Sequence, residues 1–248
     1  MSRFEVYILC EGYHDRAFWA GWLVRLGCTN LGRGCVDPWG KSVTGGQFGF
    51  QTHAERFVRV VAAGGKDEVR RLARIRLQGR ATEPLKAVVA SVDHDGFDNA
   101  NVTEGPLNRE SLASLANEID AEAERVADNH FRIDGGSVDI AVVRWQSDGT
   151  HGESVPRQQT LERLCCSAIL DAYGDRADPV RVWLASRPGV APEAGPKAFV
   201  WSHMAGWYAE HGCDDFYQQL WREDQVAEAL EKRLRDADAW QTVESLLA

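Results

Sequence analysis

The chain has 248 residues, of which 44% are hydrophobic and 26% are charged, and its formal net charge is -9. These values are ordinary for a soluble globular protein, and the length suffices for one large domain or two small ones. The acidic balance excludes a protein that coats nucleic acid by bulk electrostatics, but it allows a localised contact.

The same sequence limits the compartment and the redox state. No apolar run reaches the roughly 18 to 20 residues of a membrane-spanning helix, and the N-terminal stretch lacks a secretory signal, so we expect a cytoplasmic protein without membrane contact. The six cysteines have no CxxC pair and no framework spacing, which predicts reduced, mostly buried thiols. A zinc site built from Cys28, Cys35 and His53 is the alternative, and their spacing does not favour it.

The first predicted strand, residues 4–10, ends at a carboxylate. Its apolar run stops at Glu11 and Gly12, and a helical pattern follows over residues 14–26. The carboxyl ends of strands in α/β sheets open onto the crevice where ligands bind, so packing explains a glutamate there poorly. We therefore predict that Glu11 belongs to an acidic metal site. The alternative is that Glu11 only begins a solvated loop.

Residues 27–49 are glycine-rich and irregular, with a short strand predicted at residues 35–36. The tripeptide Gly40-Lys41-Ser42 is similar to the end of a P-loop. However, Cys35 stands where the GxxxxGK[ST] pattern needs glycine, and no apolar helix follows. We set the P-loop aside and retain Lys41 as a candidate contact to a substrate phosphate.

Apolar residues recur at steps of three and four over residues 52–77, which predicts two helices divided at Gly64-Gly65. The second helix carries the dense basic cluster of the chain: Arg70, Arg71, Arg74, Arg76 and Arg80. A solvated helix face is the simpler interpretation of this cluster. The functional interpretation is a patch that contacts nucleic-acid phosphates through Arg70, Arg71 and Arg74.

A second strand, residues 86–92, also ends in carboxylates, in the sequence Asp93-His94-Asp95-Gly96. Alternate residues of an extended chain point the same way, so Asp93 and Asp95 can face one space and share a hard cation. A calcium EF-hand loop does not fit, because its glycine is sixth rather than fourth and a helix precedes it. Asp98 is either a further ligand or a turn former.

The rest of the chain alternates helices and strands before it becomes helical. We predict a helix over residues 110–127, a strand over 138–145, a polar loop over 146–157, a helix carrying Leu161, Leu164 and Ile169, a strand over 180–185 and a loop over 186–195. Glu162 lies in the first turn of the helix after the polar loop. From residue 197 onward all patterns are helical.

These motifs resemble the TOPRIM domain of type IA and type II topoisomerases, bacterial primases, ribosomal RNA maturases and the overcoming-lysogenization-defect (OLD) nucleases. The resemblance lies in a strand that ends in EG with an acid three residues later, followed by a strand that ends in DxDG. The later stretches TLERLCC, GPKAFVWSHMAGW and DDFYQQLW are most similar to the small stand-alone TOPRIM proteins and the TOPRIM half of OLD nucleases.

The resemblance covers most of the chain and implies a fold and a site. The implied fold is α/β: a TOPRIM (Rossmann-like), mainly parallel sheet flanked by helices. It forms one domain over residues 1–248, with a core over 1–185, an insertion over 27–85 and a helical C-terminal extension over 196–248. The implied cofactor is Mg²⁺ or Mn²⁺. The implied metal-site acids are Glu11, Asp93 and Asp95, with Asp15 as an accessory acid and Glu162 as the helix-borne acid of the OLD-like group.

By the same resemblance, Lys197 corresponds to the functional lysine of the OLD-like group. It would supply positive charge to the leaving oxygen or the scissile phosphate; the alternative is a solvated lysine at a helix start. His14 and His94 flank the acids and are candidate proton shuttles, or histidines that support the acids or face solvent.

Two functions follow as hypotheses. The first is a metal-dependent nuclease, with DNA favoured over RNA, that serves as an effector of a bacterial anti-phage system. The chain carries no ATPase motif, so an OLD-like activity would need a separate ATPase partner. The second is a non-catalytic TOPRIM module that binds nucleic acid or such a partner. A topoisomerase is disfavoured because a strand-passage domain is missing from the sequence. A primase is disfavoured because no zinc-binding or helicase-binding module is visible in it. The oligomeric state is not predicted.

Overall fold

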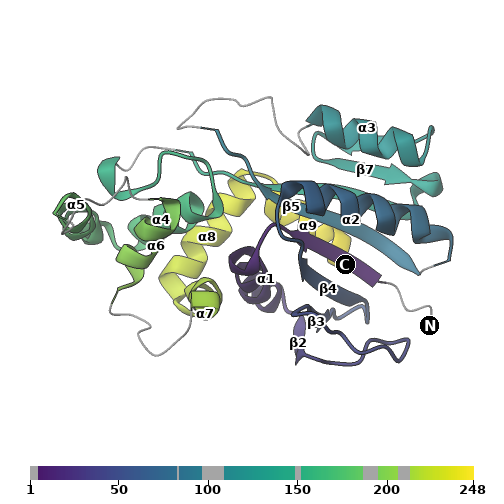
Figure 1. The fold of residues 1–248 in the computed structure, drawn as a ribbon, viewed down its shortest axis with the longest axis horizontal. Helices are drawn as coiled ribbons and strands as arrows, with labels where there is room; N and C mark the ends of the chain where they lie inside the picture. Colours follow the sequence, from purple (N-terminus) through teal and green to yellow (C-terminus); the bar gives the residue numbers. More distant parts are fainter. Residues whose placement is uncertain (1–4, 83, 97–108, 149–151, 187–194, 206–212) are drawn as a thin grey trace.

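The computed structural model describes residues 5–82, 84–96, 109–148, 152–186, 195–205 and 213–248, and a mixed eight-stranded sheet forms its centre (Figure 1). Asp98 lies outside the described residues. The strands are β1 (Glu5–Cys10), β2 (Thr29–Arg33), β3 (Phe48–Gln51), β4 (Phe57–Ala62), β5 (Leu85–Asp93), β6 (Glu124–Ala127), β7 (His130–Ile133) and β8 (Val138–Trp145). Their order across the sheet is β2-β3-β4-β1-β5-β8-β7-β6.

The middle of this sheet is parallel and its two edges are antiparallel. Strands β4, β1, β5 and β8 run in the same direction, whereas the β2-β3 pair and the β7-β6 pair run antiparallel at the two sides. The strands predicted at 4–10, 86–92 and 138–145 are confirmed as β1, β5 and β8. Their carboxyl ends therefore meet at one edge of the sheet.

Helices cover both faces of the sheet (Figure 1). They are α1 (Tyr13–Arg25), α2 (Lys66–Gln78), α3 (Arg109–Ile119), α4 (Leu161–Ala172), α5 (Ala177–Ala185), α6 (Pro196–Met204), α7 (Cys213–Gln219), α8 (Asp224–Asp236) and α9 (Ala239–Leu247). Strand β1 shows how the two faces arise. Val6 and Ile8 point into the core formed with α1, α4, α8 and α9, while Tyr7 and Leu9 point into the core formed with α2 and α3. A strand buried on both faces reads as a continuous apolar run.

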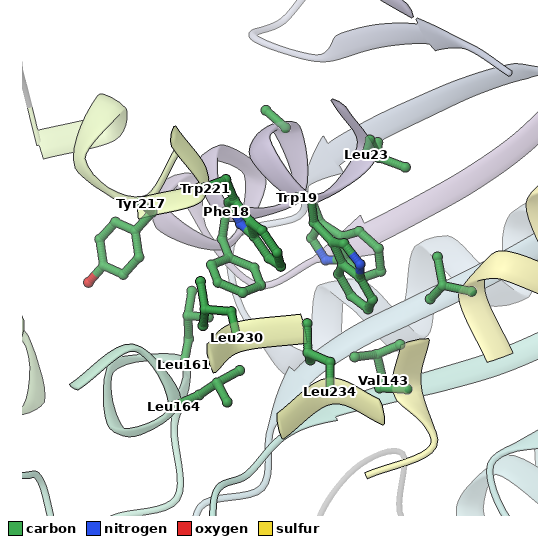
Figure 2. Close-up of a cluster of buried hydrophobic side chains, with 14 of the residues drawn as sticks. Phe18, Trp19, Leu23, Val143, Leu161, Leu164, Tyr217, Trp221, Leu230 and Leu234 are labelled. Carbon is green, nitrogen blue, oxygen red and sulfur yellow. The ribbon is translucent and has the colours of Figure 1, made fainter. Parts of the chain in front are cut away.

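The larger core joins α1 to the C-terminal helices through aromatic side chains. Phe18 of α1 lies beside Trp221, with ring centroids 5.1 Å apart. Figure 2 shows Trp19 of α1 and Leu230 and Leu234 of α8 in the same cluster. Trp22 stacks on Trp221 with ring centroids 6.3 Å apart and an interplanar angle of 8°. Residues near the two ends of the described chain are thus packed into one core.

The structure corrects the helix predicted in the first half of residues 52–77. Residues 57–62 form β4, which lies between β3 and β1. The spacing of Phe57, Val58 and Val61 satisfies a helical pattern, but the same run suits a strand buried on both faces. Val58 faces one core and Val61 packs against the other. The second half of the prediction is confirmed as α2.

Three further elements differ from the predictions. The predicted helix 110–127 ends at Ile119, and residues 124–127 form the exposed edge strand β6, where Val126 is 42% exposed. Residues 180–185 belong to α5 rather than to a strand, since Val180 and Leu184, one turn apart, are the buried pair. The predicted strand 35–36 is reduced to a single bridge between Val36 and Ser42, and β2 and β3 form a hairpin around it.

Among the cysteines whose side chains the structure describes, five are free thiols, of which Cys35 is half-buried and four are buried: Cys10, Cys28, Cys165 and Cys166. Among the helices of the described ranges, none combines the length and the apolar character needed to cross a bilayer.

Candidate functional site

The carboxyl ends of β1 and β5 bring two predicted acids together. The strands are parallel neighbours, with Leu9 beside Ala90. Glu11 follows β1 and Asp93 ends β5, and the backbone N–H of Asp93 donates a hydrogen bond of 2.7 Å to Glu11 Oε1. Two acids that are 82 positions apart in the sequence are therefore in direct contact.

These acids lie in a cleft of about 720 Å³ that also receives side chains from α1, α4 and α6. Six of the residues singled out from the sequence line it: Glu11, His14, Asp15, Asp93, Glu162 and Lys197. Four carboxylates from three different segments therefore face one space, with an exposed lysine at its edge.

Asp15 is one of the buried carboxylates of the cleft. Its Oδ1 accepts a hydrogen bond of 2.7 Å from the indole of Trp145, and its Oδ2 accepts one of 3.2 Å from the backbone N–H of Gly12. Burial raises the pKa of Asp15 to about 7, because the loss of solvent outweighs the Trp145 hydrogen bond and the charges of Glu11 and Glu162 add to the effect. Asp15 can thus gain or lose a proton near neutral pH.

Asp93 is repelled by the negative charges of all three other carboxylates in the cleft. Its Oδ1 accepts a hydrogen bond of 2.8 Å from the backbone N–H of Leu161, the first residue of α4. Burial raises the pKa of Asp93 well above its usual range, and the nearby charges of Asp15, Glu162 and Glu11 raise it further. A cluster of this kind takes up protons, or binds cations, to relieve its negative charge.

Glu11 and Glu162 are held from the two sides of the cleft. Burial also raises the pKa of Glu11, opposed by the Asp93 N–H and by the charge of Lys66. Glu162 is buried in the first turn of α4, and the hydroxyl of Tyr217 donates a hydrogen bond of 3.1 Å to its Oε1. The ring of Tyr217 stacks on that of His14, with centroids 4.8 Å apart. Helix α7 therefore supports an acid that α4 presents.

Asp95 is not among the residues that line the cleft. Its backbone has a φ of 63°, in the left-handed region, so the extended alternation that would align it with Asp93 has ended. Its carboxylate is 46% exposed, forms an ion pair with Lys66 and accepts a hydrogen bond of 3.0 Å from the side chain of Gln158. Asp93 and Asp95 were predicted to face one space, but only the side chain of Asp93 lines the cleft.

Lys66 is a candidate site residue that the sequence patterns missed. It begins α2 after Gly64 and Gly65, whose backbone N–H groups donate hydrogen bonds of 2.9 and 3.0 Å to the carbonyl oxygen of Glu11. Residues 57–62 were predicted as a helix. Their carboxyl end was therefore not expected at the sheet edge where Glu11 and Asp93 lie. A glycine pair between a strand and a helix is the signal that could have revealed it.

The predicted phosphate contacts lie away from the cleft lining. Lys41 is exposed in the loop before β3, and its backbone N–H donates to Asp37. On α2, Arg71 pairs with Glu68 and Arg74 pairs with Glu118, each at 2.7 Å. These acids offset part of the positive charge of the predicted patch.

Two other sequence candidates occupy different surroundings. Arg70 lies on α2 one turn after Lys66. His94 follows β5 outside the cleft lining, and burial lowers its pKa, helped by the charges of Arg144 and Lys66. Its imidazole is therefore mostly neutral near pH 7.

No group of three or more His, Cys, Asp and Glu side chains within the described ranges is arranged to hold a metal ion. This includes Cys28, Cys35 and His53. In the cleft, Asp15 and Asp93 each accept hydrogen bonds from neighbouring groups, and Lys66 lies beside Glu11. Binding of a cation would therefore require side chains to rearrange.

No protein-family model matches the chain, and no curated protein matches it. Among solved structures, the fold is similar to the crystal structure of the hypothetical protein PH0156 from Pyrococcus horikoshii OT3, with a TM-score of 0.71 and 18% identity. The match covers 99% of this chain and 100% of that one. At this identity the similarity supports the α/β fold, with a mixed sheet flanked by helices, and carries no argument about chemistry.

Proposed function

We propose that the protein is a Mg²⁺-dependent nuclease that hydrolyses phosphodiester bonds at a TOPRIM-type acidic site. The observation that carries the proposal is the contact between Glu11 and Asp93 at adjacent strand ends. They share one cleft with Asp15, Glu162 and Lys197. An array of carboxylates with a lysine at its edge suits metal-assisted phosphoryl chemistry better than it suits packing.

The donor set fits a hard divalent cation in its chemistry. Carboxylate oxygens are the ligands that Mg²⁺ takes in proteins, and the mutual repulsion that raises the pKa of Asp93 is relieved by positive charge. Glu11, Asp93 and Glu162 would hold the ion, with Asp95 once its side chain turns. The chemistry that Mg²⁺ supplies at such a site is positive charge, which stabilises a phosphodiester transition state and acidifies water.

The protein's own residues supply the remaining functions. Lys197, exposed in the first turn of α6, would contact the scissile phosphate and the leaving oxygen. Asp15 lines the same cleft, and its carboxylate would accept the proton of the attacking water. Tyr217 would keep Glu162 directed into the cleft through its hydrogen bond.

The biological setting rests on the resemblance to small TOPRIM proteins and OLD nucleases. We propose a cytoplasmic effector of a bacterial anti-phage system that acts on nucleic acid, with DNA favoured over RNA, together with a separate ATPase partner.

Two observations favour a second candidate, a non-catalytic TOPRIM module that binds nucleic acid or a partner ATPase. Lys66 neutralises part of the acidic cluster, and the described side chains form no ready metal site. A module that kept its acids without a metal would have these same features.

Cleavage assays separate the two candidates. Purified protein is incubated with supercoiled plasmid, linear DNA or structured RNA in Mg²⁺, Mn²⁺ or EDTA, beside Glu11→Gln, Asp93→Asn and the surface control Glu244→Gln, on the exposed side of α9. For a nuclease we expect metal-dependent cleavage that falls by roughly 10² or more in the two site variants and persists in the control. If wild type and site variants are equally inert, with candidate partner proteins added, the binding module is the better description.

A further inference from the structure

Lys66 occupies the junction of the two acidic strand ends. Its ammonium Nζ donates a hydrogen bond of 2.9 Å to the carbonyl oxygen of Asp93, forms an ion pair with Asp95 and lies 3.9 Å from Glu11 Oε1. Only 17% of the Lys66 side chain is exposed. An ammonium group has three donors, so one cation here serves oxygens from both strand ends.

We propose that Lys66 is an internal cation that holds the acidic site together without metal, and that a divalent cation must displace it to bind. The inference rests on the proposed function, because it concerns how that site is loaded. The displaced ammonium would then be free to contact a phosphate of the substrate.

The first argument is competition for the same oxygen. Glu11 Oε1 faces the Lys66 ammonium and is also a proposed metal ligand. Mg²⁺ binds oxygen at about 2.0 to 2.1 Å, so an ion on Glu11 Oε1 would lie within about 6 Å of Nζ. Two cations this close in a half-buried cleft repel each other. Binding of the divalent ion therefore favours departure of the lysine.

The second argument is that the backbone beside Lys66 is fixed, whereas its side chain has several rotatable bonds. The N–H groups of Gly64 and Gly65 are tied to the carbonyl of Glu11, and these glycines have φ values of 95° and 121°. Lys66 thus starts its helix from an anchored turn. Its four-carbon side chain can withdraw the ammonium without a change in the backbone.

The third argument explains the position of Asp95. Its carboxylate is paired with Lys66 and lies outside the cleft lining, although it is the predicted partner of Asp93. Departure of Lys66 would remove the ion pair and leave this carboxylate with the hydrogen bond from Gln158. One movement would then vacate a cation position and release an additional acid from its ion pair.

Metal binding and stability test the proposal without reference to cleavage. Calorimetric titration with Mn²⁺, and thermal unfolding in EDTA or Mn²⁺, are compared for wild type, Lys66→Met, Lys66→Arg and the distant, exposed control Lys232→Met. We expect Lys66→Met to bind Mn²⁺ at least about tenfold more tightly and to melt lower than wild type in EDTA, with the loss reversed by Mn²⁺. Lys66→Arg keeps the charge and should stay near wild type, as should the control.

A measurement on the wild-type protein guards against a variant that does not fold. The chain has only five lysines, at positions 41, 66, 86, 197 and 232, so a lysine-selective ¹³C label gives few side-chain Cε signals. We expect the Lys66 signal to shift as Mg²⁺ saturates the site. A Lys66 signal that does not move, or unchanged or weaker Mn²⁺ affinity in Lys66→Met, overturns the proposal.

The outcomes separate this proposal from the nuclease proposal. Tighter binding in Lys66→Met without cleavage by any form keeps the internal cation and rejects the nuclease. Cleavage that depends on Glu11, combined with unchanged Mn²⁺ affinity in Lys66→Met, keeps the nuclease and rejects the internal cation. If neither wild type nor Lys66→Met binds metal, Lys66 is not what excludes it, and the proposal is overturned.

Discussion

At the scale of single residues, two buried aspartates have opposite relations to pH. Burial raises the pKa of Asp15 from 3.8 to about 7. Burial also disfavours the charge of Asp139, but a hydrogen bond from His130 and the charge of Lys86 outweigh it, so the pKa of Asp139 is lowered. Between pH 4 and 7 folded Asp15 keeps a proton that the unfolded chain has lost. This contribution to stability is therefore greatest below pH 4 and is lost as the pH rises to about 7.

We therefore predict that the effect of Asp15→Asn on the melting temperature in EDTA is more favourable at pH 8 than at pH 4, because the amide carries no charge at either pH, whereas its loss of one accepted hydrogen bond is the same at both. The difference between the two effects on the free energy of unfolding should be on the order of a few kcal/mol. Asp139→Asn should lower the melting temperature at both pH 5 and pH 8, since the stability given by a depressed carboxylate pKa is lost only when the pH falls through that pKa. Equal effects of Asp15→Asn at pH 4 and pH 8 would contradict the assigned environment.

The acids of the site could be predicted at this scale, but the cation among them could not. Glu11 and Asp93 each end an apolar strand, and the edge at which parallel strands end is a general property of α/β sheets. Lys66 could be placed among these acids only if residues 57–62, which precede it, had been recognised as a strand. Asp95 was predicted beside Asp93 from ideal alternation, which the left-handed backbone at Asp95 interrupts.

At the scale of elements, α1 packs against the C-terminal helices through a glycine. A Cβ added at Gly21 would lie 2.2 Å from Cδ1 and 2.9 Å from Cβ of Trp221, which is itself buried. Because the neighbouring atoms are close to the Trp221 backbone, a small rotation of the ring cannot make room. The helix must either move away from Trp221 or distort.

We predict that Gly21→Ala lowers the free energy of unfolding by at least about 1 kcal/mol, although alanine favours helix by about 1 kcal/mol over glycine. Gly174→Ala is the matched control, because an added Cβ there has no atom within 4 Å, and it should change stability by less than about 0.5 kcal/mol. Urea unfolding of both variants measures the difference. A Gly21→Ala variant as stable as wild type would mean that α1 and Trp221 are not in this contact.

Elements that depend on partners distant in the sequence were the ones that patterns predicted wrongly. The apolar residues of β4 fit both helical and strand spacing. The segment forms a strand because it pairs with β3 on one side and β1 on the other. β6 is exposed along its whole length, so no buried face marks it in the sequence. Local sequence patterns were sufficient for the other elements. The continuous apolar runs of β1, β5 and β8 and the amphipathic spacing in α2 and α4 predicted these elements correctly.

At the scale of the whole molecule, the two ends of the described chain share a core. Residues of β1, α1 and β8 are packed with residues of α8 and α9 in a single cluster. The opposite face of the sheet has its own cluster, formed with α2 and α3. Because both clusters include side chains of β1, β5 and β8, loss of one face removes support from the other. We therefore expect the sheet and the C-terminal helices to unfold as one cooperative unit.

Leu230→Ala tests this expectation. Leu230 is fully buried in α8, so the substitution should cost about 2 to 5 kcal/mol. The loss should be the same whether it is read from tryptophan fluorescence, which reports on the core around Trp22 and Trp221, or from hydrogen exchange of the α2 amides on the opposite face. Leu31→Ala, at a position 37% exposed on β2, should cost less than about 0.5 kcal/mol. If the fluorescence changes at a lower denaturant concentration than the exchange of the α2 amides, the C-terminal helices unfold as a separate unit. The sheet and these helices would then not form one cooperative unit.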